Sequence, residues 1–428
     1  MVNKINNLDC SSAVQAKMFS YVSDALNNAS KQYSCSVNSD FDWVRFGISR
    51  VLHRHGSGRE FFQDLRMESM GKLNIKRHDF QEGLKSKRRL AHLTSVNENY
   101  LRKRSQDSFK QKEGNLPKSL DGFHIYAADG HFHAASCHDA RDAKGRKNAI
   151  GHLYSMNLRN RDLSHLALSS DGHRDKPHDM GVIKRMDVTG LRQGASKGQK
   201  LLYIWDRAGI DFLAWRKWKH NNGIYFLSRS KANMTKEVMG NIPFDRNSSE
   251  NSGVIANQYI GAGEVIRMVT YNDIELNETF EFITNLPHSI EPGVIAQLYR
   301  MRWDIEKVFD DVKNKLEEHK SWAKSHTAKR MQAQFIVVAY NLLMALRQEI
   351  EEKERLHEKS IQVKADKRWE ETCEVYRRMK RPIPLWLGKL RRITQVSVKF
   401  IRWARAMFIR PSSWRQSIDL LAYEYAQN

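Results

Sequence analysis

The sequence predicts an α/β protein whose core is interrupted by a β-rich insertion and flanked by helical regions. Residues 1–115 contain no proline and show apolar residues three and four apart, as amphipathic helices do. Apolar runs separated by turn residues then recur between Gly122 and Ser228, as strands do. Turn residues and alternating runs dominate from Arg229 to Pro287, before helical spacing returns.

The composition indicates a polyanionic partner and a cytoplasmic protein. The chain has 428 residues, enough for two or three cores, and a formal net charge of +22 that is spread along its length. Such an excess favours nucleic acid. No apolar run approaches the roughly 18 residues of a membrane span, and the N-terminus lacks the apolar segment of a signal peptide. The four cysteines show neither metal-binding nor disulfide spacing, so reduced thiols are expected.

Residues 1–115 are predicted to form a helical, basic region that binds DNA. Two clusters of cations alternate with leucines at helical spacing. Phosphate contact is one interpretation of such clusters, and a solvated helix face is the other. The cations proposed for DNA contact are Lys85, Lys87, Arg88, Arg89, Arg102 and Arg104.

A predicted strand within 122–136 opens the first part of the core, residues 116–230, and carries Asp129. A glycine follows Asp129, so an ordinary turn aspartate is the alternative to a functional carboxylate. Two further runs, Ile150–Leu158 and Leu163–Ser169, suit antiparallel strands. Three strands of which the first carries an acid are the beginning of a ribonuclease H-like domain.

A second candidate carboxylate follows the most apolar strand of the core. Lys200–Trp205 has the continuous apolar pattern of a buried parallel strand and ends at Asp206. Open α/β sheets place their chemistry at the carboxyl ends of such strands, which favours a functional role for Asp206. A cap for the next helix is the alternative. Arg207 follows directly and is a further candidate for DNA contact.

The remainder divides into three predicted parts. Residues 231–288 form a β-rich insertion, which separates Asp206 from the second part of the core, residues 289–350. Residues 351–428 are helical and basic, which fits either DNA contact or a subunit interface.

The second part of the core contains a predicted helix from Leu298 through Lys315. Four of its polar side chains fall within roughly 60° of arc, at about 100° per residue, beside an apolar stripe. They are Tyr299, Arg302, Glu306 and Lys313. The helix therefore presents one carboxylate flanked by two cations and a phenol. A solvated helix whose own side chains form salt bridges is the alternative.

The pattern Tyr-x2-Arg-x3-Glu-x6-Lys resembles the signature of the DDE transposases of insertion-sequence family 4, bacterial cut-and-paste enzymes of the ribonuclease H-like superfamily. The resemblance covers about residues 120–350 and includes the insertion before the glutamate. It implies that the catalytic acids, which also bind metal, are Asp129, Asp206 and Glu306. It implies that transposon-end phosphates are contacted by Tyr299, Arg302 and Lys313.

Three carboxylates without histidine or cysteine form a hard, oxygen-only cluster, which selects Mg²⁺ or Mn²⁺ over zinc. Two such ions, about 3.5–4 Å apart, can activate an attacking water or 3′-hydroxyl and stabilise the leaving oxygen. His131 and His133 lie close to the first aspartate in sequence, but we expect them to be sheet residues and not metal ligands.

The sequence therefore predicts a DNA transposase that cleaves the ends of its own element and joins the 3′-hydroxyls to target DNA. The expected partners are double-stranded DNA, as transposon ends and as target, and a second copy of the chain in a homodimer on paired ends. Two alternatives stay open. One is a ribonuclease H-like nuclease without strand transfer, and the other is a catalytically silent DNA-binding protein descended from a transposase.

Overall fold

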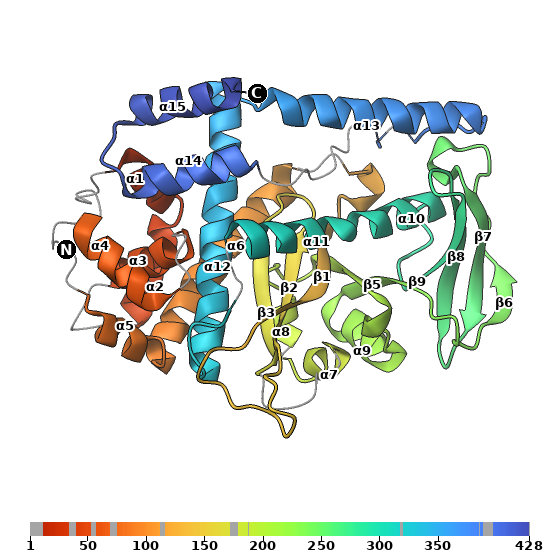
Figure 1. Ribbon diagram of the computed structural model, residues 1–428. Helices are drawn as coiled ribbons and strands as arrows, with labels where there is room; N and C mark the ends of the chain where they lie inside the picture. Colours follow the sequence, from red (N-terminus) through yellow and green to blue (C-terminus); the bar gives the residue numbers. More distant parts are fainter. Residues whose placement is uncertain are drawn as a thin grey trace.

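The structure, a computed structural model, describes most of the chain. The described residues are 12–33, 40–52, 57–68, 75–111, 116–171, 179–186, 188–316, 320–384, 386–387 and 397–427. Within those ranges, no helix is both long enough and apolar enough to span a membrane. The prediction of an α/β protein is confirmed, since many helices accompany one large mixed sheet (Figure 1).

Nine strands of the described chain form a single sheet in the order β3-β2-β1-β4-β5-β9-β8-β7-β6 (Figure 1). Their bounds are β1 (Phe123–His133), β2 (Ile150–Asn157), β3 (Leu163–Ser170), β4 (Lys200–Trp205), β5 (Ile224–Arg229), β6 (Glu237–Asn241), β7 (Val254–Gly261), β8 (Val265–Asp273) and β9 (Glu278–Thr284). Every residue of β2 is buried, so both faces of the sheet are covered there.

Among the first five strands, β1 contains Asp129, and β4 ends directly before Asp206. β1 is antiparallel to β2 and β2 to β3, whereas β1, β4 and β5 run parallel to one another. Between β4 and β5 the chain crosses over through α9 (Phe212–Asn222). This helix begins where the Asp211 side chain accepts the N–H of Ala214, and it ends at Gly223, whose φ of 63° favours glycine. The short helices α7 (Asp179–Ile183) and α8 (Val188–Leu191) precede β4.

The insertion predicted for residues 231–288 extends the core sheet. β6, β7, β8 and β9 form an antiparallel array, and β9 pairs with β5 where Leu227 lies opposite Thr284. The Thr284 hydroxyl donates a hydrogen bond to the carbonyl of Phe226, which closes the end of this junction. A short 3-10 turn, η3 (Ser249–Asn251), precedes β7.

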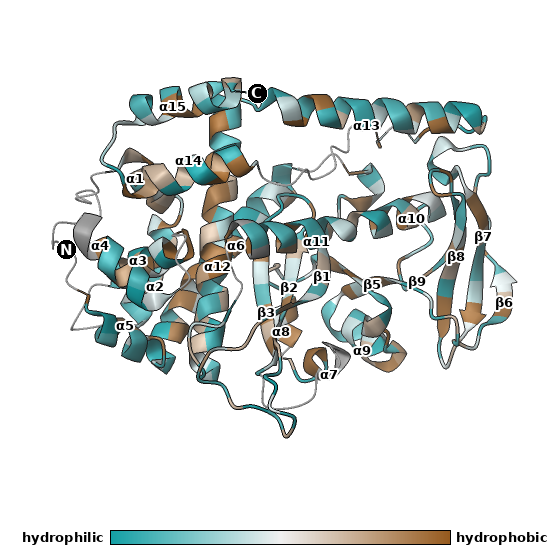
Figure 2. Cartoon of the chain, viewed as in Figure 1, coloured by the Kyte–Doolittle hydropathy of each residue, from teal (hydrophilic) through white to brown (hydrophobic). Residues whose placement is uncertain are grey.

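Helix α12 (His326–Glu349) lies between the N-terminal helices and the sheet, because it contacts α3 and α6 as well as β3. Figure 2 shows apolar residues along much of its length. A side chain at Gly47 of α3 would overlap the ring of Phe335, so glycine allows this close approach. The N-terminal helices are α1 (Ala13–Ser20), α2 (Ser23–Gln32), α3 (Asp40–Leu52), α4 (Gly58–Glu68), α5 (Arg77–Gly83) and α6 (Lys87–Gln111), followed by η1 (Lys118–Leu120).

The C-terminal helices join the two ends of the described chain. They are η5 (Ile350–Glu354), α13 (Lys359–Arg378), α14 (Val398–Ile409) and α15 (Trp414–Ala426). α14 and α15 pack against α1, and the backbone N–H of Ala13 donates to the carbonyl of Ser412 at 3.1 Å. α13 runs along one edge of the molecule (Figure 1).

The helix predicted from Leu298 through Lys315 is interrupted at Arg302. The structure has α10 (Pro292–Met301) and α11 (Trp303–Asp310), followed by the π-helical segment η4 (Asp311–Lys315). At the junction, the N–H of Arg302 bonds to the carbonyl of Tyr299, and the N–H of Ile305 bonds to that of Arg302. These three-residue spacings tighten the turn there, whereas the π turn widens it further on. The assumption of one regular helix was therefore wrong.

Candidate active site

Asp129 and Asp206 lie at corresponding positions on neighbouring parallel strands. The register of β1 and β4 places Ala127 opposite Ile204, and each aspartate follows two residues later. The Asp129 carboxylate accepts the N–H of Gly130 at 2.8 Å, and Asp206 accepts the N–H of Ala208 at 2.8 Å. Asp206 is thus the cap of the 3-10 turn η2 (Arg207–Gly209), as its alternative interpretation proposed, and it also sits at the carboxyl end of a buried strand.

Arg302 connects the first aspartate to the glutamate. One guanidinium nitrogen lies 2.8 Å from Asp129 Oδ2, and another lies 2.9 Å from Glu306 Oε1. The Arg302 side chain is 8% exposed, that of Asp129 21% and that of Glu306 53%. Because α11 packs on β1, the same guanidinium contacts Glu306 four residues along the helix and Asp129 on the distant strand.

Asp206 and Glu306 lie close enough to Asp129 to affect its pKa. Burial raises the pKa of Asp129 to about 6, although the Arg302 guanidinium and the Gly130 N–H act in the opposite direction. The negative charges of Asp206 and Glu306 raise it further. Asp129 therefore lacks enough positive charge around it in this structure, even with an arginine in contact.

The Tyr299 side chain is buried, whereas a phenol that contacts phosphate from a helix surface would be exposed. Its ring packs on Phe282 of β9, with 5.0 Å between ring centroids, and the Arg302 guanidinium lies 5.8 Å from the Tyr299 ring. Burial raises the pKa of the Tyr299 phenol, and Arg302 opposes this. The backbone of Lys313 lies in η4, but its side chain lies outside the described residues. A role in phosphate contact stays a prediction for Tyr299, Arg302 and Lys313.

A pocket of about 320 Å³, lined in part by Tyr299 and Phe282, opens between the insertion and α10–α11. Trp303, which is 52% exposed, contributes to its lining, and so does Phe280, whose ring lies 4.3 Å from the Arg229 guanidinium. The sequence reasoning did not single out Trp303 or Arg229. The sequence could have indicated both residues. Trp303 follows Arg302 directly, and Arg229 is the last residue of a parallel core strand, close to the carboxyl-end position that Asp206 has at the end of β4.

Three of the seven cations predicted to contact DNA are engaged within the protein. Arg88 bonds to the carbonyl of Tyr33 and to Asp40. The guanidinium of Arg89 lies 4.0 Å from the ring centroid of Trp43. Two nitrogens of Arg104 bond to the two carboxylate oxygens of Asp162 at 3.1 and 3.2 Å. The contacts of Arg88 and Arg89 hold α6 against the neighbouring N-terminal helices, and those of Arg104 hold it against the loop before β3. A charge pattern alone therefore does not mark these residues as surface cations.

The other four predicted cations face solvent. They are Lys85, Lys87, Arg102 and Arg207. Arg207 follows Asp206 directly and carries its charge next to the candidate site. His131 and His133 are buried in the sheet, where His131 packs on Phe309 with 5.1 Å between ring centroids.

The donor chemistry of the three carboxylates fits a hard divalent cation, with one condition. Among the residues that the structure describes, no group of three or more acids, histidines or cysteines is arranged closely enough to hold a metal ion. Between Asp129 and Glu306, the Arg302 guanidinium occupies the place of a cation. A metal ion would have to take over these contacts from Arg302.

A family model and a solved structure can be compared with this chain. Residues 120–342 match the family described as "Transposase DDE domain". The chain is also similar to piggyBac transposase in a solved synaptic complex with hairpin DNA, at 9% identity and a TM-score of 0.41, with 98% of this chain and 86% of that chain covered. Among curated proteins, none matches this sequence.

Proposed function

Because this chain belongs to the family of transposases with a DDE domain, we propose that it cuts double-stranded DNA at the ends of its own element and joins those ends to target DNA. In the first step a water oxygen attacks phosphorus, and the 3′-oxygen of the transposon strand leaves as a hydroxyl. In the second step that 3′-hydroxyl attacks a target phosphate, its proton is lost, and a target 3′-hydroxyl leaves. The resemblance to insertion-sequence family 4 in the signature residues supports this cut-and-paste scheme.

The observation that carries the proposal is the convergence of the three acids. Asp129 and Asp206 come from neighbouring strands, and Glu306 comes from a helix that is far away in sequence but in contact with Arg302 beside Asp129. A merely salt-bridged surface helix needs no aspartate from the sheet. The raised pKa of Asp129 further marks a group whose surroundings are unusual for a structural carboxylate.

A ribonuclease H-like core is the fold that we propose for residues 116–230 and 289–350. The order β3-β2-β1-β4-β5, with β2 antiparallel to its neighbours and β1, β4 and β5 parallel, supports it. The division into helical ends, core and insertion remains our proposal for how the chain is organised.

Asp129, Asp206 and Glu306 are the residues that we propose as ligands of Mg²⁺, or of Mn²⁺ as a substitute. Two such ions, when bound, would activate the attacking oxygen and stabilise the leaving one. The hydrogen bonds from Gly130 and Ala208 restrain the two aspartates, and the second oxygen of Asp129 faces Arg302, which supports this assignment. Glu306 is half-exposed and enters from the solvent side.

Arg302 has a second proposed task once its carboxylates are taken by metal. A guanidinium released from Asp129 and Glu306 presents a planar fork, which suits a bidentate bond to a phosphate. Its burial against Tyr299 limits how far it moves. We propose that Arg302 holds the phosphate next to the cleaved bond, together with Tyr299 and Lys313. Lys85, Lys87, Arg102 and Arg207 remain proposed contacts to more distant phosphates, and the assembly on paired ends is proposed to be a homodimer.

A second candidate function is a DNA-binding protein that has lost catalysis. The observation that favours it is the Arg302 guanidinium, which neutralises Asp129 and Glu306 without any metal. If these contacts persist in the DNA complex, Asp129 and Glu306 serve only to hold α11 on the sheet.

Cleavage of a supercoiled plasmid that carries the ends of the element tests the proposal. We expect Mg²⁺ or Mn²⁺ to support cuts at the end junctions and the joining of 3′-ends to a second plasmid. Glu306→Gln and Asp206→Asn should bind the ends but not cut. Cutting without joining would favour the nuclease, and binding without cutting under either metal would favour the silent DNA-binding protein.

A further inference from the structure

A groove of about 690 Å³ lies between the N-terminal helices and the core, away from the carboxylates. Its N-terminal wall comes from the end of α3 and from α4 and α5. Its core wall comes from the loop after β1 and from the segment 320–325 before α12. Six basic residues line it, and we call it the cationic groove: Arg50, Arg59, Arg77, Lys85, Lys320 and Lys324.

Three of the six cations of the cationic groove have no carboxylate partner in the part of the chain that the structure describes. Of the described residues that line it, none is acidic. Within the described chain, Arg59, Arg77 and Lys324 form no ion pair with a carboxylate, and all three are exposed. Lys85 pairs with Glu82 at 2.7 Å, but both side chains are more than half exposed, so water weakens this pair. The groove therefore concentrates a field that attracts polyanions.

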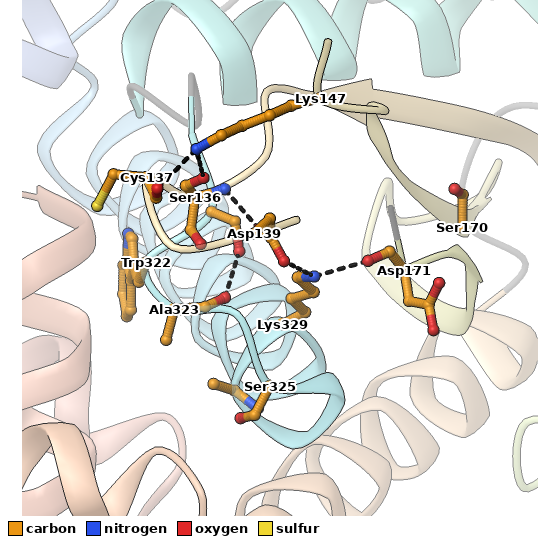
Figure 3. A network of polar contacts seen from close by, with 12 residues as sticks. Ser136, Cys137, Asp139, Lys147, Ser170, Asp171, Trp322, Ala323, Ser325 and Lys329 are labelled. Atoms are coloured by element: carbon orange, nitrogen blue, oxygen red, sulfur yellow. Dashed lines mark hydrogen bonds and ion pairs between the residues drawn. The ribbon is translucent and has the colours of Figure 1, made fainter. Parts of the chain in front are cut away.

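The core wall of the groove is fixed by a buried ion pair (Figure 3). The Lys329 ammonium, which is fully buried on α12, lies 2.7 Å from Asp139 and 2.7 Å from the carbonyl of Asp171. Asp139 in turn accepts the N–H of Ser136 at 2.7 Å. Lys147 donates to the carbonyls of Ser136 and Cys137 at 2.7 Å each. The short segment that presents Cys137 to the groove is thus held at both sides.

The segment 320–325 is attached to this wall and to the opposite one. The N–H of Ser321 donates to the carbonyl of Ala134 at 2.9 Å, and the N–H of Trp322 donates to the Gln332 side chain at 2.8 Å. The guanidinium of Arg50 from α3 lies 5.6 Å from the Trp322 ring centroid. The segment that carries Lys320 and Lys324 is therefore held in place by hydrogen bonds to the residue after β1 and to α12, which lowers the entropic cost of ligand binding there.

Two elements lead directly from the carboxylates to the cationic groove. Along β1, Ala134 lies five residues beyond Asp129, or about 17 Å at the usual rise of a strand. Along α11 and η4, Leu316 lies ten residues beyond Glu306, or about 15 Å at the usual helical rise. Measured along the axis of a duplex, the phosphates of one strand follow one another by about 3.4 Å. The separation therefore corresponds to about five nucleotides.

We propose that the cationic groove binds the phosphates of one strand of duplex DNA, about five nucleotides from the bond that the carboxylates cut. The contact is electrostatic and independent of base sequence, because no pattern of base-reading side chains is needed for it. The distance to the cut rests on the proposed function, whereas the binding of DNA phosphates does not.

Salt dependence of DNA binding, measured with EDTA present so that no cutting occurs, tests the contact. The probe is a short duplex of random sequence. The variant Arg59→Gln/Lys324→Gln removes one charge from each wall, and Lys197→Gln/Lys217→Gln removes two exposed charges elsewhere as a control. We expect the first variant to flatten the slope of log affinity against log salt by about 1.8, or about 0.9 for each lost phosphate contact. The control should keep the slope of the intact protein. Equal slopes for both variants and the intact protein would overturn the proposal.

Crosslinking from Cys137 tests the position. Cys137 is exposed and lines the groove, so a photoreactive group on its thiol reports on DNA held there. The other three cysteines are replaced by serine. On a duplex that carries the element's end, we expect crosslinks about five nucleotides from the cut junction, and crosslinks to no DNA position would overturn the proposal. A protein that crosslinks and shows the salt effect but never cuts would contradict the proposed function while supporting the groove.

Discussion

Two aspartates ten residues apart, Asp129 on β1 and Asp139 in the loop after it, meet their cations in different surroundings. Asp139 and Lys329 are 2% and 0% exposed, and the lysine is held by a backbone carbonyl as well. Asp129 and Arg302 are 21% and 8% exposed, and the arginine is shared with the half-exposed Glu306. The first pair is closed to solvent, and the second is open on the side of Glu306.

The pKa directions of the two aspartates separate a satisfied carboxylate from an unsatisfied one. Burial alone would raise the pKa of Asp139, but hydrogen bonds from Lys329 and Ser136 outweigh it and lower the pKa. Burial raises the pKa of Asp129 to about 6, and Arg302 does not outweigh it. A carboxylate that stays short of positive charge is prepared for a further cation, whereas Asp139 already has what it needs.

The largest expected effect is a loss of DNA cleavage when a carboxylate at the Arg302 pair is changed, but not when the Asp139–Lys329 pair is changed. Glu306→Gln should reduce the rate of end cleavage by at least about a thousandfold, or roughly 4 kcal/mol of transition-state stabilisation, because a metal ligand is lost. The free energy of unfolding should change by less than about 1 kcal/mol, because Glu306 is half-exposed. Cleavage kinetics and urea unfolding of the same preparation measure both. A variant that unfolds easily but still cuts would reverse the roles that we assign.

Lys329→Met should show the opposite behaviour. It leaves Asp139 buried without its cation, so the free energy of unfolding should fall by about 3–5 kcal/mol. The double variant Lys329→Met/Asp139→Asn should recover part of this loss, since asparagine is neutral and still accepts the N–H of Ser136. If the double variant is as unstable as the sum of the two single variants, the pair is not coupled and the comparison fails.

The smallest expected effect is a difference in pH dependence. The lowered pKa of Asp139 contributes stability that is present above its ordinary value of 3.8 and lost as pH falls through the folded-state pKa. The raised pKa of Asp129 works in the other direction, because its contribution is present below 3.8 and is lost as pH rises through about 6. Without metal at pH 7, Asp129→Asn should therefore raise stability by on the order of 1 kcal/mol, whereas Asp139→Asn should lower it.

Urea unfolding in EDTA at a series of pH values checks these signs. The Asp129→Asn difference should shrink as pH falls from about 6 towards 3.8. The Asp139→Asn difference should shrink only as pH falls below 3.8, through the lowered folded-state pKa of Asp139. Two variants that change stability in the same direction at pH 7 would show that the surroundings of the two aspartates do not differ as described.

Local patterns predicted the strands well, but not how distant strands pair. The run Ile150–Leu158 became β2, and Lys200–Trp205 became β4 with the same bounds. The pairing of β5 with β9 joins segments that are more than fifty residues apart, and no periodicity reports on it. The interruption at Arg302 was missed for another reason, because the residues around it keep helical spacing while the hydrogen bonds tighten.

Two local features of the sequence predicted the candidate site. Asp206 follows a buried strand, and Glu306 lies in the spacing of the signature residues. What could not be predicted is which cation each carboxylate meets. Lys329 has the sequence context of an ordinary helical cation, yet it pairs with an aspartate 190 residues away. The inward orientation of Arg88 and Arg104 likewise depends on Asp40 and Asp162, which only the folded chain brings near.

The central claim is that Asp129, Asp206 and Glu306 surround one metal site. Iron(II) can replace Mg²⁺ there, and with ascorbate and peroxide it generates hydroxyl radicals that break the backbone close to the bound ion. We predict fragments that end near residues 129, 206 and 306, which Mg²⁺ in excess suppresses and Asp206→Asn reduces. This readout does not depend on DNA cleavage. Breaks elsewhere, or breaks that Asp206→Asn leaves unchanged, would contradict the claim and leave Arg302 as the only cation of the site.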